Sequence, residues 1–410
     1  MISEPDRELD ELRLLLTELL PSGWVDAAVR GDEHAVRAHR DQIDNPSLVR
    51  VLGRAGWISP HWPTGQGGRG LAIEAARAVV DLLDDWQVPR VPRGSGLSLA
   101  APTIIEWADE ATKERLLPPI ASGEERWCQL FSEPGAGSDM ASLATTAVLD
   151  GDEWVVNGQK VWTTYGHESE FAMLIARTDP RAPKHRGITY FGLDMRQDGV
   201  DVRPLVNMAG DLEFNEVFLT DTRVPDLYRI SPVGEGWAAA MTTLGAERHA
   251  LSGAKKKRKA SDEILGGMTV DQVIELAREL ELTGDHVIRN RLARAWSDSK
   301  VLEWTVQRGR DRRAAGHGAG SEGSVTKIAK AVTNQSLQVL AVDLLGARAQ
   351  ACDRGDVAEE FVHEFLRTRA NSIEGGNYEI QRNIVGERVL GLPREPDPYK
   401  GRPWHDVPRG

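Results

Sequence analysis

The sequence predicts a mainly α-helical protein with a β domain in the middle of the chain. Apolar residues recur at helical spacing up to about residue 122, short β-branched runs follow to about residue 228, and long helical patterns resume from about residue 234. The 410 residues allow two to four domains. We therefore expect an N-terminal helical domain (1–122), a middle β domain (123–230), a C-terminal helical bundle (231–395) and a tail (396–410).

Composition and charge narrow the classes of protein. Apolar residues make up 40% of the chain and charged residues 27%, as in ordinary folded proteins. The net charge of −12 argues against a general nucleic-acid-binding protein, whose surface would be basic. Cys128 and Cys352 are too few for a disulfide framework or a four-thiolate zinc site, and no His-x-x-x-His or Cys-x-x-Cys motif occurs. We therefore expect a reducing compartment and no metal.

Hydropathy predicts no membrane span. No stretch approaches the ~20 consecutive apolar residues that cross a bilayer as a helix. The N-terminus is acidic and lacks the apolar core of a signal peptide. We expect a cytoplasmic protein.

The N-terminal zone is predicted to be helical from the spacing of its apolar residues. Residues 73–83 form one such pattern, and a Gly- and Pro-rich loop at 60–70 precedes it. Five leucines near the start share the spacing that places side chains on one helix face: Leu12, Leu15, Leu16, Leu19 and Leu20.

The middle zone contains short runs rich in β-branched or apolar residues, which are typical of strands. These runs cover residues 146–149, 153–156, 171–176, 188–193 and 217–219. Because Asn-Gly is a favoured two-residue hairpin turn, we expect the chain to turn back at Asn157-Gly158. The zone should form a small, mostly antiparallel, barrel-like β domain.

The C-terminal zone is predicted to be a four-helix bundle, because its helical patterns are long, apolar and joined by short connections. A basic run, Lys255–Lys259, lies in the loop 254–267. Such runs bind phosphate or direct nuclear import, but in so acidic a chain we expect a solvated loop. The candidate helices are residues 236–252, 270–312, 325–351, 356–370 and 377–390.

Glu247 is the first candidate for chemistry. It follows Leu244 by three residues and precedes Leu251 by four, so it falls on the apolar face of its predicted helix. A carboxylate on a buried face must be paired, hydrogen-bonded or protonated, and burial raises its pKa towards that of a useful general base. Periodicity alone favours the alternative, a structural Glu–Arg pair at a contact between helices, and Arg248 lies at the edge of the same face.

Two further motifs could hold a ligand. The loop Ser132-Glu-Pro-Gly-Ala-Gly-Ser138 brings small residues, backbone N–H groups and two hydroxyls close together, as anion sites do, although a tight connection between strands would look similar. It matches neither a Walker loop nor a dinucleotide-binding fingerprint. Trp162-Thr163-Thr164 could stack on a planar ring and bond its polar edge, or could be a core Trp at a strand end.

Taken together, several motifs resemble the acyl-CoA dehydrogenase family, over nearly the whole chain and most closely its actinobacterial-type branch. The resemblance implies N-terminal helices, a middle β domain and a C-terminal four-helix bundle. The motifs that carry the resemblance are Phe131-Ser-Glu-Pro-Gly-Ala-Gly-Ser-Asp139, Asn157-Gly-Gln-Lys160 with Trp162-Thr-Thr164, Lys184-His-Arg-Gly187, Asn215-Glu-Val-Phe218 with Arg223-Val-Pro225, Glu379-Ile-Gln-Arg-Asn383 and Glu387-Arg-Val-Leu-Gly-Leu-Pro393.

The resemblance also implies FAD between the β domain and the bundle. Ser132 would hydrogen-bond the flavin, Trp162 and Thr164 would lie beside its ring, and Ser138 would face phosphates of the flavin or the pantetheine of the substrate. Gly346 and Asn377 would contact FAD partly across a subunit interface. The full set of residues expected to bind the cofactor is Gln129, Leu130, Phe131, Ser132, Gly137, Ser138, Trp162, Thr163, Thr164, Gly346, Asn377 and Glu379.

The family base is a Glu at one of two places. Its commoner place corresponds to Gly375 here, and Glu374 falls one residue short of it. The other place is the Glu of a Leu-x-x-Glu-Arg helix, which matches Glu247, supported by Arg248. The resemblance therefore implies that Glu247 removes the α-proton of a thioester while the Gly375 backbone N–H stabilises the enolate oxygen.

The implied reaction belongs to lipid metabolism, of the fatty acid β-oxidation kind. It converts an acyl-CoA to a trans-2-enoyl-CoA and passes electrons to an electron-transfer flavoprotein. A homodimer or homotetramer is expected, and a heterotetramer is compatible because the Arg-x-x-Phe-Gly signature that reaches the partner's flavin is absent. Three alternatives stay open: a dehydrogenase of carrier-protein thioesters, a flavin monooxygenase on the same scaffold, and a non-catalytic subunit of a heteromeric enzyme.

Overall fold

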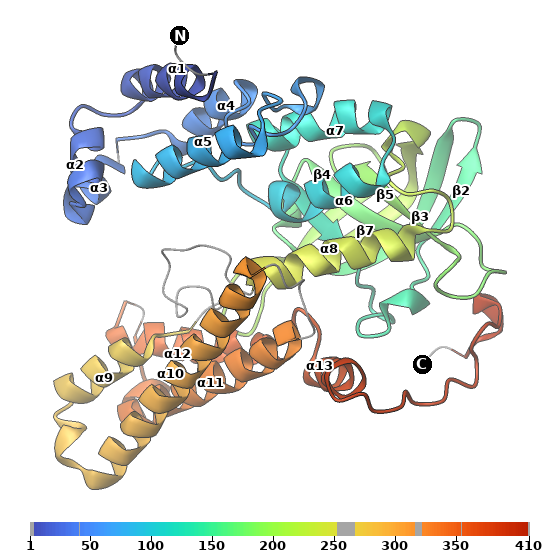
Figure 1. Cartoon of the computed structure of the whole chain (residues 1–410). Coiled ribbons are helices and arrows are strands. Elements are labelled where there is room, and N and C mark those ends of the chain that lie inside the picture. Colours follow the sequence, from blue (N-terminus) through green and yellow to red (C-terminus); the bar gives the residue numbers. More distant parts are fainter. Residues whose placement is uncertain (1–3, 41, 252–266, 316–321, 354, 409–410) are drawn as a thin grey trace.

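The computed structural model describes residues 4–40, 42–251, 267–315, 322–353 and 355–408. Helices come first, a β sheet follows and helices return, so the fold class predicted from the sequence is confirmed (Figure 1). The Lys255–Lys259 run lies outside the described residues. None of the helices in the described ranges is long and apolar enough to cross a membrane.

The N-terminal helices pack around a core of their own. Leu12 and Leu16, from the predicted leucine face, are fully buried and pack with Trp24, Leu52 and Leu83. The predicted helix at 73–83 is present as α5. The helices of this zone are α1 (Glu4–Leu19), α2 (Trp24–Arg30), α3 (Glu33–Arg40), α4 (Asn45–Arg54), α5 (Ile73–Asp85), α6 (Ala101–Trp107) and α7 (Glu110–Ser122).

The middle zone forms one curled sheet. Its strands are β1 (Trp127–Leu130), β2 (Thr146–Asp150), β3 (Glu153–Thr164), β4 (Phe171–Arg177), β5 (Ile188–Asp194), β6 (Val200–Leu205) and β7 (Phe214–Pro225). The order is β1-β4-β2-β3-β7-β6, and β5 also pairs with β4. The pairs are antiparallel except that β4 runs parallel to β1 and β2.

The hairpin predicted at Asn157-Gly158 is wrong. β3 continues through both residues, and the chain turns instead at Gly151, between β2 and β3. The register with β7 shifts here, as in a β-bulge. A Cβ on Gly158 would lie 2.3 Å from the Thr145 hydroxyl, so this glycine permits close approach of two chain segments. Asn157 bonds Asp221 through its side chain, at 2.9 and 3.0 Å.

The C-terminal helices follow the sheet. α9, α10, α11 and α12 share a core that includes Val273, Leu337 and Phe361. α8 lies instead against α6 and β5 (Figure 1). The bounds are α8 (Gly236–Leu251), α9 (Val270–Glu279), α10 (His286–Ala314), α11 (Glu322–Leu345), α12 (Val357–Arg367) and α13 (Tyr378–Ile384).

The single helix predicted over 270–312 is two helices. Glu281 has a positive φ of 56° and a short 3-10 turn, Leu282–Gly284, separates α9 from α10. The Asp285 carboxylate then accepts hydrogen bonds from the backbone N–H groups of Val287 and Ile288. Such a cap starts a new helix, and the apolar pattern on either side of the break conceals it.

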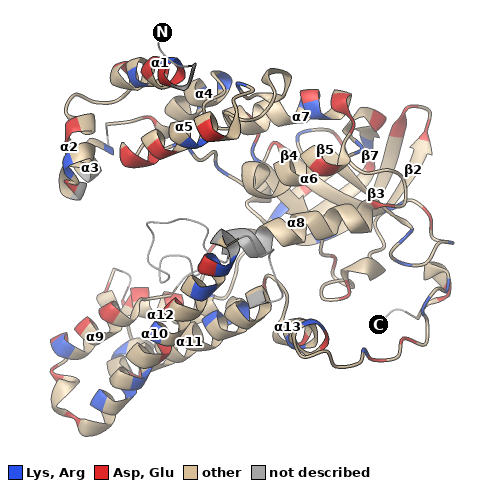
Figure 2. Ribbon diagram, in the orientation of Figure 1, with Lys and Arg blue, Asp and Glu red and all other residues tan. Residues whose placement is uncertain are grey.

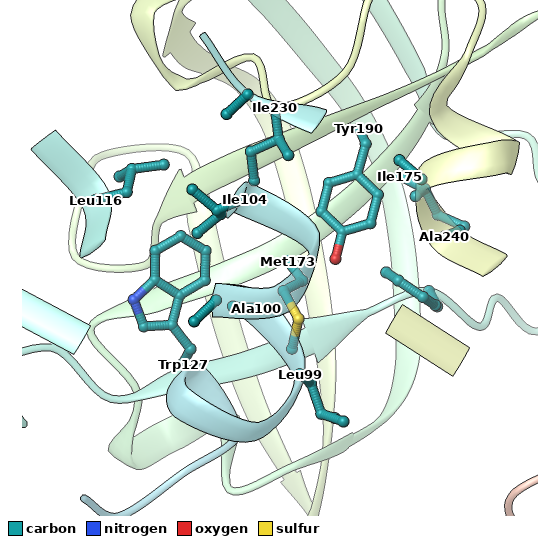
Figure 3. Packing of buried hydrophobic residues seen from close by; sticks show 14 of the residues in the cluster. Leu99, Ala100, Ile104, Leu116, Trp127, Met173, Ile175, Tyr190, Ile230 and Ala240 are labelled. Carbon is teal, nitrogen blue, oxygen red and sulfur yellow. The ribbon is translucent and has the colours of Figure 1, made fainter. Parts of the chain in front are cut away.

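A buried cluster joins the N-terminal helices, the sheet and α8. The side chains of Trp127, Ile104 and Tyr190 meet there (Figure 3). The Tyr190 hydroxyl lies 2.9 Å from the hydroxyl of Thr243 in α8, which in turn lies 2.7 Å from the hydroxyl of Thr103 in α6. This cluster therefore fixes α8 relative to the sheet.

The tail returns to the β domain. The Trp404 backbone N–H donates to the Ala182 carbonyl at 2.9 Å, and its indole N–H donates to the Ser142 carbonyl at 3.3 Å. The Arg177 guanidinium lies 4.3 Å from the centre of the Trp404 ring, a cation–π contact. The last described residues thus pack on the middle zone (Figure 1).

Candidate functional site

The loop after β1 carries the first predicted site residues. The Ser132 carbonyl accepts a hydrogen bond from the Val161 N–H at 2.9 Å, so the loop lies along β3. Leu130 and Phe131 are buried in the two cores beside the sheet, and only their backbone groups can meet a ligand. Gln129 and Ser132 are half-buried, whereas Gly137 and Ser138 are exposed.

A buried ion pair holds this loop in place. Lys160 donates to the Glu133 carboxylate at 2.8 Å and to the Phe131 carbonyl at 3.1 Å. Glu133 also accepts hydrogen bonds from the N–H groups of Ala144 and Thr145, at 2.7 and 2.9 Å. Burial raises the pKa of Glu133, but the Lys160 charge and these hydrogen bonds outweigh burial, so the pKa lies below its usual value. The pair fixes both strand segments that carry site residues.

Trp162 has a backbone conformation that side chains of its size rarely adopt. Its φ is +63°, at a second register shift between β3 and β7, and its side chain is 61% exposed. The indole meets the ring of Phe214 edge to face, 5.9 Å between centres. Thr164 is exposed, and the buried Thr163 hydroxyl has no hydrogen-bond partner among the described residues. The interpretation of Trp162 as a core residue is therefore wrong.

This arrangement fits a planar ligand such as the expected flavin. An exposed indole on a backbone held at positive φ offers a flat apolar face to such a ligand. The hydroxyls of Thr164 and Ser132 lie on the adjoining segments and can bond a polar ring edge. In the described ranges, no group of three or more His, Cys, Asp or Glu side chains is placed to bind a metal ion.

The C-terminal part of the chain reaches the same loop through Asn377. Its side-chain amide donates to the Ser138 hydroxyl at 2.9 Å, although the two residues are 239 positions apart. Its carbonyl oxygen accepts from the Ile380 N–H at 2.9 Å and caps α13. Glu379 is exposed in the first turn of α13, and Gly375 takes a positive φ of 63° just before it. Two predicted site segments therefore meet.

Gly346 is not brought to this site within one chain. It ends α11 with a φ of +56°, and no hydrogen bond or ion pair in the described part of the chain joins it to the Ser132 loop. Asp343, one turn earlier, pairs with Arg291 of α10. The family resemblance implies that Gly346 contacts FAD partly across a subunit interface, and this stays a prediction.

Glu247 lies in α8, but its side chain and that of Arg248 are outside the described residues. α8 carries no charged residue from Gly236 to Ala246 (Figure 2). The rival carboxylate, Glu374, accepts a hydrogen bond from Asn371 at 2.9 Å and pairs with Arg367 at 3.4 Å. Glu374 is thus already engaged by other side chains.

Sequence reasoning missed the groups that support the site. Arg367 at the end of α12 and Glu213 just before β7 form a largely buried ion pair, and Glu133 and Lys160 form another. A lysine inside a strand, three residues after an Asn-Gly bulge, was a usable signal for the second pair. The first pair joins distant segments, so no local pattern indicates it.

A cleft of about 620 Å³ lies elsewhere, at the beginning of β1. Its walls come from the end of α3, α4, the segment 87–93 and the residues next to β1. They include Arg40, Arg50, Arg90, Arg93 and Arg126. The Ser132 loop leaves the opposite end of β1, so this cleft is separate from the candidate site.

Comparisons with known proteins match most of the chain to one family. The chain matches the family descriptions "Acyl-CoA dehydrogenase, N-terminal domain" over residues 23–124, "middle domain" over 128–222 and "C-terminal domain" over 234–390. It is 37% identical to the acyl-CoA dehydrogenase IpdE1 of Mycobacterium tuberculosis, covering 90% of this chain and 93% of that protein. It is 39% identical to the acyl-CoA dehydrogenase FadE34 of the same organism, over 84% of this chain and 46% of that one.

Solved structures resemble the fold over nearly its full length. The Tcur3481-Tcur3483 steroid ACAD is 26% identical with a TM-score of 0.69, covering 95% of this chain and 98% of that chain. The ChsE4-ChsE5 complex of Mycobacterium tuberculosis is 25% identical with a TM-score of 0.65, covering 96% of this chain and 100% of that chain.

Replacing Glu133 by Gln should destabilise the protein by about 3–5 kcal/mol, because Lys160 would remain buried without a counter-charge. Denaturant unfolding at neutral pH measures this loss. The wild-type advantage should shrink on acidification, since a group whose pKa is lowered by folding contributes stability that disappears as the pH falls through that pKa. Asp150→Asn, which breaks an exposed pair with Arg223, is the control and should change stability little. Equal losses in both variants would contradict this account.

Replacing Trp162 by Gly should leave the stability of flavin-free protein unchanged or higher. Glycine adopts a positive φ freely, and relief of strain worth about 1–3 kcal/mol offsets the added chain entropy of about 1 kcal/mol. Flavin retained per chain after gel filtration should fall at least tenfold. Tyr399→Ala, which removes an exposed aromatic side chain from the tail, should retain flavin fully. Full flavin content in the Trp162 variant would remove this residue from the site.

Proposed function

Because the chain belongs to the acyl-CoA dehydrogenase family, we propose that it uses FAD to oxidise an acyl-CoA thioester to a trans-2-enoyl-CoA and passes the electrons to an electron-transfer flavoprotein. The family membership makes the chain an oxidoreductase. The observation that carries the finer proposal is the exposed, strained indole of Trp162 beside the Ser132 loop, which Asn377 joins from the C-terminal helices.

The residues proposed to hold FAD lie on two neighbouring segments of the β domain and on α13. Ser132 and Thr164 would donate hydrogen bonds to the ring system, and Trp162 would cover one of its faces. Gly137, Ser138 and Asn377 would meet the polar part of the cofactor or of the substrate, since small residues and amide groups allow close approach to phosphate. When bound, the flavin supplies the hydride acceptor for the reaction.

We propose Glu247 as the base. A carboxylate is a stronger base when it is poorly solvated, and the uncharged stretch Gly236–Ala246 of α8 leads directly to this residue. Thr243, one turn earlier, is buried against Tyr190. Arg248 would support the carboxylate. Glu374 is a poorer candidate because Arg367 and Asn371 already engage it.

Gly375 is the proposed donor to the thioester oxygen. Its positive φ orients a backbone N–H that a side-chain-bearing residue would present less readily. A fixed N–H donor stabilises the negative charge that develops on the oxygen as the α-proton leaves, and it needs no reorganisation during the step. The protein would therefore position a base and a donor on either side of the α-carbon.

The proposed substrate class is a CoA thioester with a bulky, steroid-derived acyl group. This proposal rests on the resemblance to a structure named a steroid ACAD, at 26% identity over nearly the whole chain. Gly245, two residues before the proposed base, has no side chain and would in this proposal leave room for such a group. Initial rates with short, long, branched and steroid-like acyl-CoAs would rank the candidates.

We also propose that the chain works as an oligomer, with a second subunit of the same family as the favoured partner. α10 exposes Trp296, Val301 and Trp304, the last of them by 66%. Apolar side chains of this size on one long helix are typical of a subunit interface. Two similar solved structures are named as pairs of different chains, Tcur3481-Tcur3483 and ChsE4-ChsE5.

The base assignment is tested by anaerobic flavin reduction. An acyl-CoA substrate should bleach the flavin of the wild type, whereas Glu247→Gln should keep its flavin and bleach about 10²–10⁴-fold more slowly, because general base catalysis is lost. Glu374→Gln is the comparison variant and should bleach much faster than Glu247→Gln, because Glu374 does not take the proton in this proposal. Abolished bleaching in the Glu374 variant with normal bleaching in the Glu247 variant would reverse the assignment.

Three further measurements separate the alternative activities. Preference for a carrier-protein thioester over the CoA thioester would favour that alternative, and substrate-dependent oxygen uptake with oxygen insertion would favour a monooxygenase. A purified protein that binds no flavin, alone or with a partner subunit, would favour the non-catalytic role.

The assembly is tested by sedimentation. The wild type should sediment as a species larger than the 45.1 kDa chain. Trp304→Glu should shift the distribution towards the monomer, because a charge cannot be buried in an apolar interface without a partner. Val148→Glu, an exposed apolar position on β2, is the control and should leave the distribution unchanged. A wild type that sediments as a monomer with and without a partner subunit would contradict the proposal.

A further inference from the structure

The Arg367 guanidinium is buried at the contact between α12 and the β domain. The side chain is 8% exposed and stands at the last position of α12. Its Nε lies 2.9 Å from one oxygen of Glu213 and its Nη2 lies 3.0 Å from the other, so the two side chains form a two-bond fork. A fork of this kind fixes relative orientation as well as distance.

Glu213 belongs to the segment that carries the proposed flavin-binding residues. Its carbonyl accepts a hydrogen bond from the Tyr165 N–H at 2.8 Å, directly after Thr164. The next residue, Phe214, pairs with Thr164 across the sheet and meets Trp162 edge to face. The Arg367 guanidinium also lies 5.7 Å from the Phe214 ring centre. The fork therefore ends beside the aromatic pair Trp162 and Phe214, which we call the Trp162–Phe214 platform.

The same guanidinium also contacts the segment that carries the proposed oxyanion donor. Its Nη2 donates to Glu374 at 3.4 Å, and Asn371 donates to the second oxygen of Glu374 at 2.9 Å. Glu374 precedes Gly375 in the chain. One arginine thus contacts a neighbour of the proposed flavin platform and a neighbour of the proposed oxyanion donor.

Resting on the proposed function, we infer that Arg367 is a positioning residue that sets the spacing between the Trp162–Phe214 platform and the Gly375 N–H. The thioester must fit between these two groups, and a displacement of about 1 Å in such a site can cost about a hundredfold in rate. Lysine cannot replace the arginine, because an ammonium group does not form the fork with both Glu213 oxygens.

A second contact makes α12 a fixed support for Arg367. His363, one turn earlier, lies 2.8 Å from Asp211 through its Nε2, and Asp211 bonds the Asn207 amide at 3.1 Å. α12 is therefore attached at two points to the segment 207–213 that precedes β7. The Arg367 Nη1 is buried and has no hydrogen-bond partner among the described residues, so its N–H groups can donate to a ligand oxygen or a water molecule.

The test compares Arg367→Lys, Arg367→Met and Glu213→Gln with the wild type in the flavin-loaded, assembled protein. We expect kcat to fall tenfold to a hundredfold in each, with KM changed less than kcat, and we expect a shifted flavin absorbance band with a bound non-oxidisable thioester. Adding Glu213→Gln to Arg367→Met should cost little more, because both changes break one interaction.

Arg369→Met is the matched control. Arg369 donates to the Phe365 and Gln335 carbonyls within the C-terminal helices and makes no hydrogen bond to the β domain among the described residues. It should lower stability without changing the flavin band or kcat. If Arg367→Met does not fold, Glu213→Gln alone decides the matter.

The outcomes distinguish a failure of the positioning role of Arg367 from a failure of the proposed function. An active wild type whose Arg367 and Glu213 variants keep normal kcat and an unshifted flavin band overturns the positioning role and leaves the proposed function intact. A wild type that neither binds flavin nor oxidises any acyl thioester overturns both. Fully additive losses in the double variant would also contradict the role.

Discussion

The contact between Lys160 and Glu133 is the constraint on which the candidate site depends. It removes two opposite charges from water and orients each by further hydrogen bonds, from Ala144 and Thr145 to Glu133 and from Lys160 to the Phe131 carbonyl. Because Glu133 directly follows Ser132 and Lys160 lies two residues before Trp162, this one pair sets the relative position of both segments. Burying this pair costs desolvation free energy, but the pair holds the two segments of the ligand site in a fixed relative position.

The sequence predicted the large features well because they depend on periodicity. Helix, sheet and helix follow from apolar spacing, and the leucine face of α1 is buried as expected. Local predictions failed where contacts with distant residues give a residue pair a backbone conformation that the pair does not usually adopt. Asn157-Gly158 is a favoured turn in isolation, but here the close approach of Thr145 makes it a bulge in a continuous strand.

The parts of the site that could not be predicted from the sequence depend on contacts between residues far apart in the chain. The motif around Trp162 was found, but neither its positive φ nor its exposure is encoded in a pattern of neighbours. The ion pair of Glu213 with Arg367 joins positions 154 residues apart, and the bond of Asn377 to Ser138 joins positions more distant still. Local patterns in a single sequence cannot predict which distant residues will pair in this way.

The anchoring of Trp404 on the β domain has a mechanical consequence. α8 leaves the middle domain at one point and the tail rejoins it at another, through the Ala182 and Ser142 carbonyls. The helices from α9 to α13 are therefore held on the β domain by the tail as well as by His363 and Arg367 of α12. Moving these helices away from the sheet would require breaking the contacts of α12 with Asp211 and Glu213, and the irregular segment between α13 and Pro403 would then limit how far the two parts could separate.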